Sequence, residues 1–198
     1  MYYTMKTAKL FFIAGVIILV GVAFLFYKKY SNPPQKQPPG AENKVLISNV
    51  SNIMKLTSPV FENNGNIPAR YTCDGENINP PLEISQVPEG AKSLVLIIND
   101  PDAPAGDWVH WTVWNISPAA KSISESSVPT GAIQGTTDFG KSGYGGPCPP
   151  SGVHHYQFKL YALDEVLNLN SSAKREDVEK VMEGHILEQV LLVGLYKR

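Results

Sequence analysis

Eighteen consecutive residues near the N-terminus, at positions 10–27, include no charged side chain (LFFIAGVIILVGVAFLFY). As a helix rising about 1.5 Å per residue, this run would span roughly 27 Å, close to the hydrocarbon thickness of a bilayer. A secretory signal peptide has a shorter apolar region and then a small-x-small cleavage site. Residues 21–23 offer such a site, but the apolar run continues beyond them. We therefore expect a transmembrane signal-anchor at 10–27, with a cleaved signal peptide as the alternative.

The anchor divides the 198-residue chain into parts of different composition. A short N-terminal tail (1–9) precedes it, and a Pro-rich spacer (28–43) follows. Residues 1–43 hold five Lys and one acidic residue, whereas residues 44–198 hold 12 Lys and Arg against 17 Asp and Glu. An acidic domain does not favour electrostatic binding to nucleic acid or to anionic lipid surfaces.

Lysine pairs flank the apolar run on both sides, so the distribution of positive charge does not decide its orientation. Almost all the folding material follows the run, which favours export of one domain at 44–198. We expect a single-pass membrane protein with this domain outside the cytoplasm, or a secreted protein if the segment is cleaved.

Hydrophobic patterns in the C-terminal part predict short strands and one helix. Residues 92–99 form a continuous apolar run, as in a strand that is covered on both faces. Residues 155–162 alternate, so that the even-numbered side chains share one face. Further strands are predicted at 110–117 and 190–196, and a helix at about 174–189, with His185 on its apolar face. The fold class is therefore mainly β and antiparallel, with one or two helices.

The first segment with candidate chemistry is NDPDAPAGDWVHW at 99–111. It lies between two predicted strands and contains three carboxylates, two Trp and one His. Its two prolines restrict the backbone and could hold a carboxylate rigidly at a strand end. The structural alternative is an ordinary turn beside core tryptophans.

The second segment is GYGGPCPPSGVHHY at 143–156, which enters a predicted strand. Its glycines and prolines allow a ligand to approach main-chain N–H groups. In a strand, His154 and Tyr156 point to the same side and His155 to the other. Imidazoles and backbone donors suit an anion such as phosphate, and a neighbouring Asp would orient the His. The alternative is that one His merely ends the strand.

These segments resemble the phosphatidylethanolamine-binding protein (PEBP) family, also called Raf kinase inhibitor-like proteins, in its bacterial and archaeal branch. Further similar pieces occur in the expected order over roughly residues 56–198. They are YTCDGEN (71–77) with Pro80–Pro81, DPDAP (100–104), HW (110–111) with NI (115–116), LYALD (160–164) and MEGHIL (182–187).

The resemblance implies a β-rich fold with a large central antiparallel sheet and a small anion-binding pocket at one end of it. The residues that it implies for the ligand are Asp100 supported by Asp102, His110, His154, Tyr156, Gly146, Pro147 and, with less support, Trp108. Relatives bind phosphate-bearing head groups, and some inhibit kinases or proteases. The family is generally not enzymatic, so the resemblance implies no catalytic residue, no metal site and no cofactor.

Two departures bear on the expected partners. The sequence ends two residues after Tyr196, without the C-terminal helix that closes the pocket in eukaryotic relatives. The anchor is not a general family feature, and an exported domain would not meet cytoplasmic kinases. Both departures argue against kinase regulation as the function of this chain.

The two cysteines, Cys73 and Cys148, leave several interpretations open. A disulfide between them fits an exported domain, while two reduced thiols are equally compatible with the sequence. A thiol hydrolase using Cys148 is disfavoured because no helix begins there to lower the thiol pKa. A metal site formed with His110 and His154 is disfavoured because no C-x-x-C or H-x-x-x-H spacing occurs.

Two functional hypotheses follow from the sequence. In the first, a membrane-tethered pocket binds an anionic or phosphorylated small molecule, such as a phospholipid head group, without catalysis. In the second, the domain is an inhibitor or scaffold of an extracytoplasmic partner protein such as a protease.

Overall fold

The computed structural model describes residues 53–198. The predicted tail, anchor and spacer, and the first residues of the predicted domain, lie outside this range. Among residues 53–198, no helix combines the length and the apolar character that crossing a bilayer requires.

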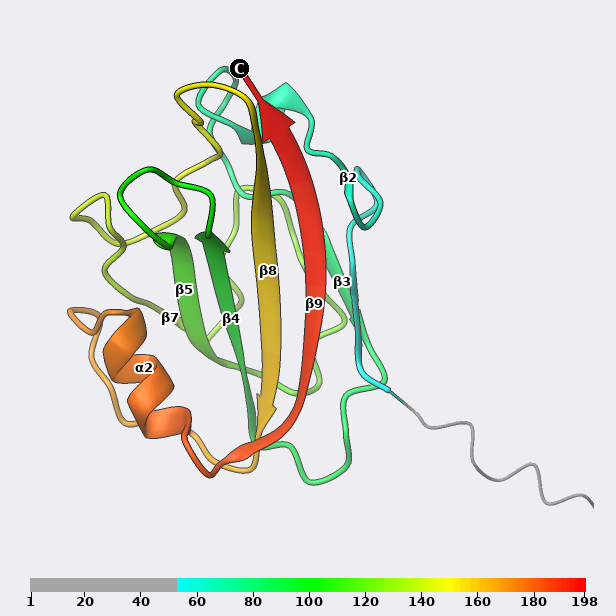
Figure 1. The fold of residues 1–198 in the computed structure, drawn as a ribbon. Coiled ribbons are helices and arrows are strands. Elements are labelled where there is room, and N and C mark those ends of the chain that lie inside the picture. The colour runs from blue at the N-terminus through cyan, green and yellow to red at the C-terminus, as the bar shows by residue number, and fades with distance from the viewer. Residues whose placement is uncertain (1–52) are drawn as a thin grey trace, which may run out of the picture. The chain divides into compact units, whose positions relative to one another are not determined.

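Residues 53–198 form two β-sheets (Figure 1). The larger has six strands in the order β2-β9-β8-β4-β5-β7, and all its pairs are antiparallel except β2 with β9. The smaller has the order β1-β3-β6. The strands are β1 (Lys55–Thr57), β2 (Gly65–Asn66), β3 (Leu82–Ser85), β4 (Ser93–Asp100), β5 (Trp108–Ile116), β6 (Ser122–Ile123), β7 (Ile133–Gln134), β8 (Val153–Leu163) and β9 (Ile186–Lys197); the helices are the 3-10 turn η1 (Ala69–Tyr71) and α2 (Arg175–Met182).

Strand β4 lies in the interior, and all eight of its residues are buried. Leu94, Leu96 and Ile98 belong to the core cluster that includes residues of the smaller sheet. Val95 and Ile97 belong to a second cluster on the other face, which includes residues of α2. The prediction of a strand covered on both faces is confirmed, and it explains why the run is uninterruptedly apolar.

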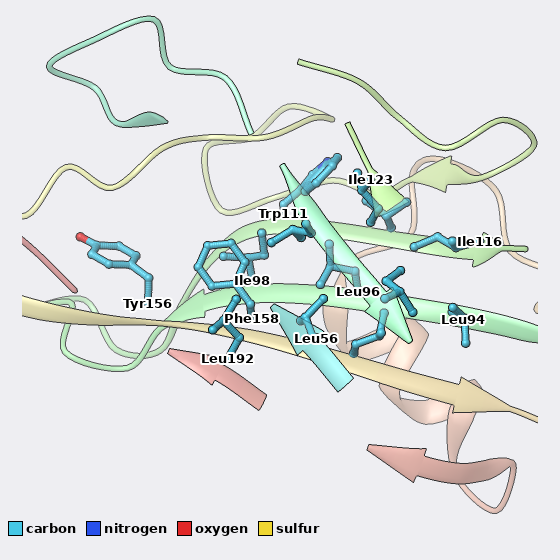
Figure 2. Packing of buried hydrophobic residues seen from close by; sticks show 14 of the residues in the cluster. Leu56, Leu94, Leu96, Ile98, Trp111, Ile116, Ile123, Tyr156, Phe158 and Leu192 are labelled. Atoms are coloured by element: carbon cyan, nitrogen blue, oxygen red, sulfur yellow. The ribbon is translucent and has the colours of Figure 1, made fainter. Parts of the chain in front are cut away.

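Strand β8 also follows its predicted alternation. Its even-numbered residues from Tyr156 to Ala162 all enter the first core cluster, together with Leu192 of β9 (Figure 2). Tyr161 packs on the opposite face, in the second cluster. Strand β9 pairs along β8 and β4 pairs with its residues 157–163, and these pairings fix the register of β8.

The predicted helix at 174–189 was too long. Helix α2 ends at Met182, Gly184 adopts a left-handed backbone (φ +83°), and β9 begins at Ile186. A glycine tolerates this conformation without steric cost, so the chain reverses there. His185 does not lie on the helix; it lies in this turn, 40% exposed, with Nδ1 2.9 Å from Asp164 Oδ1.

The two cysteines form a disulfide, with their Cα atoms 5.4 Å apart. It joins the segment after η1 to the loop that precedes β8. The hydrogen bond from Cys73 N to the Pro147 carbonyl oxygen (3.1 Å) lies beside it. Of the two interpretations that the sequence left open, the structure shows the bonded one.

Reduction of this disulfide should lower the stability of the domain substantially. The bond closes a separation of 75 residues, for which the chain-entropy model gives about 4 kcal/mol. The melting temperature should therefore fall by roughly 10 °C in a reductant or in Cys73→Ser, as calorimetry can measure. Thiol titration of the denatured, unreduced chain should find no free thiol, and two free thiols would contradict the bond.

Candidate functional site

Both segments singled out from the sequence lie at the same end of the larger sheet (Figure 1). The β4–β5 loop occupies 101–107, and the loop at 143–152 leads into β8. They border a cavity of about 290 Å³. The polar side chains around it are buried, whereas several apolar ones at its rim are exposed. The polar set is Asp100, His110, His154 and Tyr156, and the apolar set is Ala103, Pro104, Ala105, Trp108, Phe139, Pro149 and Pro150, with Cys148 beside them.

Asp100 and His154 form a buried pair, with 2.7 Å between Asp100 Oδ2 and His154 Nδ1. The other carboxylate oxygen, Asp100 Oδ1, accepts a hydrogen bond from the Asp102 backbone N–H (2.9 Å). The turn after β4 therefore fixes the carboxylate, and the carboxylate fixes the imidazole. Because a carboxylate accepts, Nδ1 of His154 donates and Nε2 remains for another partner.

His110 is held by the second loop. Its Nδ1 lies 2.6 Å from the Gly145 carbonyl oxygen, and its ring meets those of Phe139 and Tyr156 edge-on at 5.3 and 5.1 Å. The imidazole is 4% exposed, and this burial lowers the pKa of His110 below its ordinary value. The structure thus favours a neutral imidazole with its proton on Nδ1.

Tyr156 brings a buried hydroxyl to the cavity. The residue is 1% exposed, and within residues 53–198 its hydroxyl forms no hydrogen bond of good geometry, while the Asp100 carboxylate and the Cys148 backbone lie near it. Figure 2 shows the ring at the end of the apolar core, with the oxygen directed away from it. Burial, reinforced by the negative charge of Asp100, raises the pKa of Tyr156 well above its usual range. A protonated, unpartnered hydroxyl costs stability unless something in the cavity pairs with it.

Five of the eight predicted ligand-binding residues line this cavity: Asp100, Trp108, His110, His154 and Tyr156. Asp102 does not. Its Oδ2 accepts hydrogen bonds from the backbone N–H of His155 (2.8 Å) and from its Nδ1 (2.7 Å). These bonds lower the pKa of the Asp102 carboxyl.

Gly146 and Pro147 also lie outside the lining of the cavity. The N–H of Gly146 donates to Asn77 Oδ1 (2.7 Å), and a Cβ at Gly146 would come 2.7 Å from the Tyr71 carbonyl oxygen. The carbonyl of Pro147 accepts from Cys73. Both residues therefore hold the loop against the YTCDGEN segment. The residues of this loop that line the cavity are instead Cys148, Pro149 and Pro150.

Sequence reasoning missed Phe139, which lies outside both segments. Its ring packs against Trp108 (5.5 Å between centroids) and against His110, and it borders the cavity. No spacing or composition signal distinguishes this phenylalanine from any other exposed one.

Sequence reasoning also missed how α2 supports the site. Arg175 Nη1 donates to Asp107 Oδ2 (2.7 Å), and Asp107 Oδ1 accepts from Nδ2 of the buried Asn99. Asp107 immediately precedes Trp108, so this network fastens the end of the β4–β5 loop. A charged residue at the start of a helix gives no indication of such a partner 68 positions away.

The sequence model described as phosphatidylethanolamine-binding protein matches residues 57–197 of this chain. The chain belongs to the PEBP family. A UPF0098 protein from Methanothermobacter thermautotrophicus is 53% identical over 150 residues, covering 73% of this chain and 99% of the relative. A UPF0098 protein from Aquifex aeolicus is 48% identical over 163 residues, covering 79% and 95%.

Solved structures of PEBP proteins agree with this assignment. The PEBP homologue CT736 from Chlamydia trachomatis has a TM-score of 0.72 at 43% identity, covering 75% of this chain and 99% of the other. Escherichia coli YBCL, described as a new member of the mammalian PEBP family, has a TM-score of 0.69 at 33% identity, covering 73% and 98%. The recognition made from the motifs is therefore confirmed, as is the mainly β PEBP fold.

The environment of His110 makes the stability of the domain depend on pH. Its pKa in the folded chain lies below the ordinary 6.5, so below about pH 6.5 the unfolded chain binds a proton that the folded chain does not. The free energy of unfolding should therefore fall as the pH drops through this range. In His110→Asn this part of the dependence should be lost, as urea unfolding at several pH values can show.

NMR provides the direct control. The C–H resonances of the His110 ring should titrate at a pH below the ordinary value for an imidazole, about 6.5. A midpoint for His110 at or above about 6.5 would contradict the assigned neutral state.

Proposed function

We propose that this PEBP-family domain binds a phosphorylated or otherwise anionic small molecule in the cavity and carries out no chemical step on it. The observation that carries the proposal is the buried, unpartnered hydroxyl of Tyr156, which lies with two imidazoles on the floor of one cavity. Tyr156 supplies an O–H donor, and His154 supplies an N–H donor when it is charged. Such groups match the oxygens of a phosphoryl or carboxylate group.

The distribution of polarity supports a ligand with two parts. Asp100, His110, His154 and Tyr156 are each at most 7% exposed. The rim is apolar, and Phe139 on it is 40% exposed. An anionic group on the floor leaves the rest of the ligand against the rim, as the organic part of a phosphate ester would require.

The wider setting that we propose is a domain tethered to a membrane by residues 10–27 and facing away from the cytoplasm. The apolar run supports the tether, and the disulfide supports an oxidising compartment. The disulfide also occupies Cys148, the one cysteine that lines the cavity, so no thiol is available there, which supports a binding rather than a thiol-catalytic role.

The test is a thermal-shift screen of the full-length chain, in nonionic detergent, against inorganic phosphate, phosphate esters and phospholipid head groups. A ligand that binds the folded form alone raises the melting temperature by mass action. Tyr156→Phe, which removes only the hydroxyl oxygen, should weaken binding about fivefold. Tyr161→Phe is a matched control, because it makes the same change on the opposite face of β8.

If no phosphorylated compound stabilises the wild-type chain, the pocket proposal fails. If Tyr156→Phe and Tyr161→Phe bind alike, the ligand lies elsewhere. A partner protein whose capture survives substitutions at Asp100 and Tyr156 would favour an inhibitor or scaffold instead.

A further inference from the structure

The hydrogen bonds of the two cavity imidazoles decide which ring nitrogen a ligand meets. His110 Nδ1 lies 2.6 Å from the Gly145 carbonyl oxygen, and His154 Nδ1 lies 2.7 Å from Asp100 Oδ2. Both oxygens are acceptors, so each Nδ1 carries the proton. Within residues 53–198, neither Nε2 atom forms a hydrogen bond with another residue. A ligand in the cavity therefore meets Nε2 of each ring.

The two rings differ in what Nε2 can do. His154 touches a carboxylate, which compensates the charge of an imidazolium and lets Nε2–H donate. His110 Nδ1 lies against the Gly145 carbonyl and not against a carboxylate, and the ring lies in a buried, aromatic environment. Burial lowers its pKa, and a neutral ring with its proton on Nδ1 offers a lone pair at Nε2. His110 therefore accepts a hydrogen bond and does not donate one to the ligand.

We propose that His110 is a specificity-determining residue that selects anions carrying a proton, namely phosphoryl monoesters in their singly charged form. The inference rests on the anion-binding function proposed above. The P–OH group of such a ligand donates to His110 Nε2, while Tyr156 O–H and His154 Nε2–H donate to its other oxygens. The site then offers one acceptor, His110 Nε2, and two donors, Tyr156 O–H and His154 Nε2–H. The ligand offers one P–OH donor and two acceptor oxygens in return.

Anions without an acidic proton do not fit this pattern. A phosphodiester or a sulfate ester would place a bare oxygen opposite the lone pair of His110 and leave that buried acceptor unpaired. The negative charges of Asp100 and Asp138, which both act on His110, further disfavour a doubly charged ligand. The structure thus assigns the cavity to monoesters rather than to the diester linkage of an intact phospholipid.

The decisive comparison uses methyl phosphate and methyl sulfate, with dimethyl phosphate as the diester. The methyl phosphate monoanion and methyl sulfate have nearly the same size and the same charge, and they differ by one acidic O–H. Isothermal titration of the full-length chain in nonionic detergent at pH 6.5 should show about tenfold tighter binding of the methyl phosphate monoanion. The monoanion concentration follows from the ligand's second pKa, near 6. Dimethyl phosphate should bind as weakly as methyl sulfate.

Two asparagine variants assign the preference to one ring. His110→Asn keeps an N–H donor for the Gly145 carbonyl but removes Nε2, so the preference for methyl phosphate should fall to about twofold or less. His154→Asn keeps a donor for Asp100 and should weaken both ligands together, leaving the preference intact. His185→Asn, at the exposed turn before β9, should change neither affinity.

The possible failures are distinguishable. If methyl sulfate binds as tightly as methyl phosphate, the selection by His110 is overturned while anion binding stands. If His110→Asn retains the full preference, another group makes the selection. If none of the three anions binds the wild-type chain, both this inference and the proposed function are overturned.

Discussion

The position of the site depends on the alternation of side chains along β8. Phe158, Leu160 and Ala162 face the core cluster, because β4 pairs with β8 without a register shift and β9 keeps one register with it as far as Ala162. The same two-residue period then directs Tyr156 and His154 to that side of the sheet. The hydrophobic core ends beside Tyr156 (Figure 2), and beyond it Tyr156 and His154 border the cavity. A shift of one residue in register would expose the core and remove the site together.

The other cavity residues are placed by contacts at the same end of the sheet. Pairing of Asp100 with Trp108 in the β4–β5 ladder sets two of them opposite each other. The disulfide and the hydrogen bond from Gly146 N–H to Asn77 Oδ1 fix the position of the glycine- and proline-rich loop. The carbonyl of Gly145 in this loop in turn fixes the ring of His110. The protonation pattern of the cavity therefore depends on a loop that contributes mainly its backbone.

Much of the fold could be predicted because its main strands have strong patterns. The run at 92–99 is apolar on both faces, and the alternation at 155–162 is regular, so both strands were located to within two residues. The helix was overextended because its apolar spacing happens to continue through Ile186, where the chain has already reversed at Gly184. Periodicity alone does not detect that reversal, since a glycine also occurs within helices.

The candidate site was also predicted only in part. Residue type indicated the two segments, strand parity placed His154 and Tyr156 on one side of a strand, and the family resemblance singled out Asp100 and His110. Asp102 lies outside the cavity because it is two residues beyond Asp100 in a tight turn, where its carboxylate meets His155 on the other side of β8. Phe139 and Arg175 reach the site from other parts of the chain, and such contacts leave no trace in local sequence.

The sequence by itself determined that an apolar N-terminal run precedes a β-rich domain of the PEBP family, with acidic and imidazole side chains near two Gly- and Pro-rich loops. These properties can be read from local composition and from the periodicity of apolar residues, because both involve residues that are close in sequence. Only the tertiary structure decided that Cys73 and Cys148 are bonded, that the Tyr156 hydroxyl is left without a well-aligned hydrogen bond within residues 53–198, and that each cavity imidazole uses Nδ1 in a hydrogen bond. Those features depend on distances between residues far apart in sequence, and the folding of the sheet sets those distances.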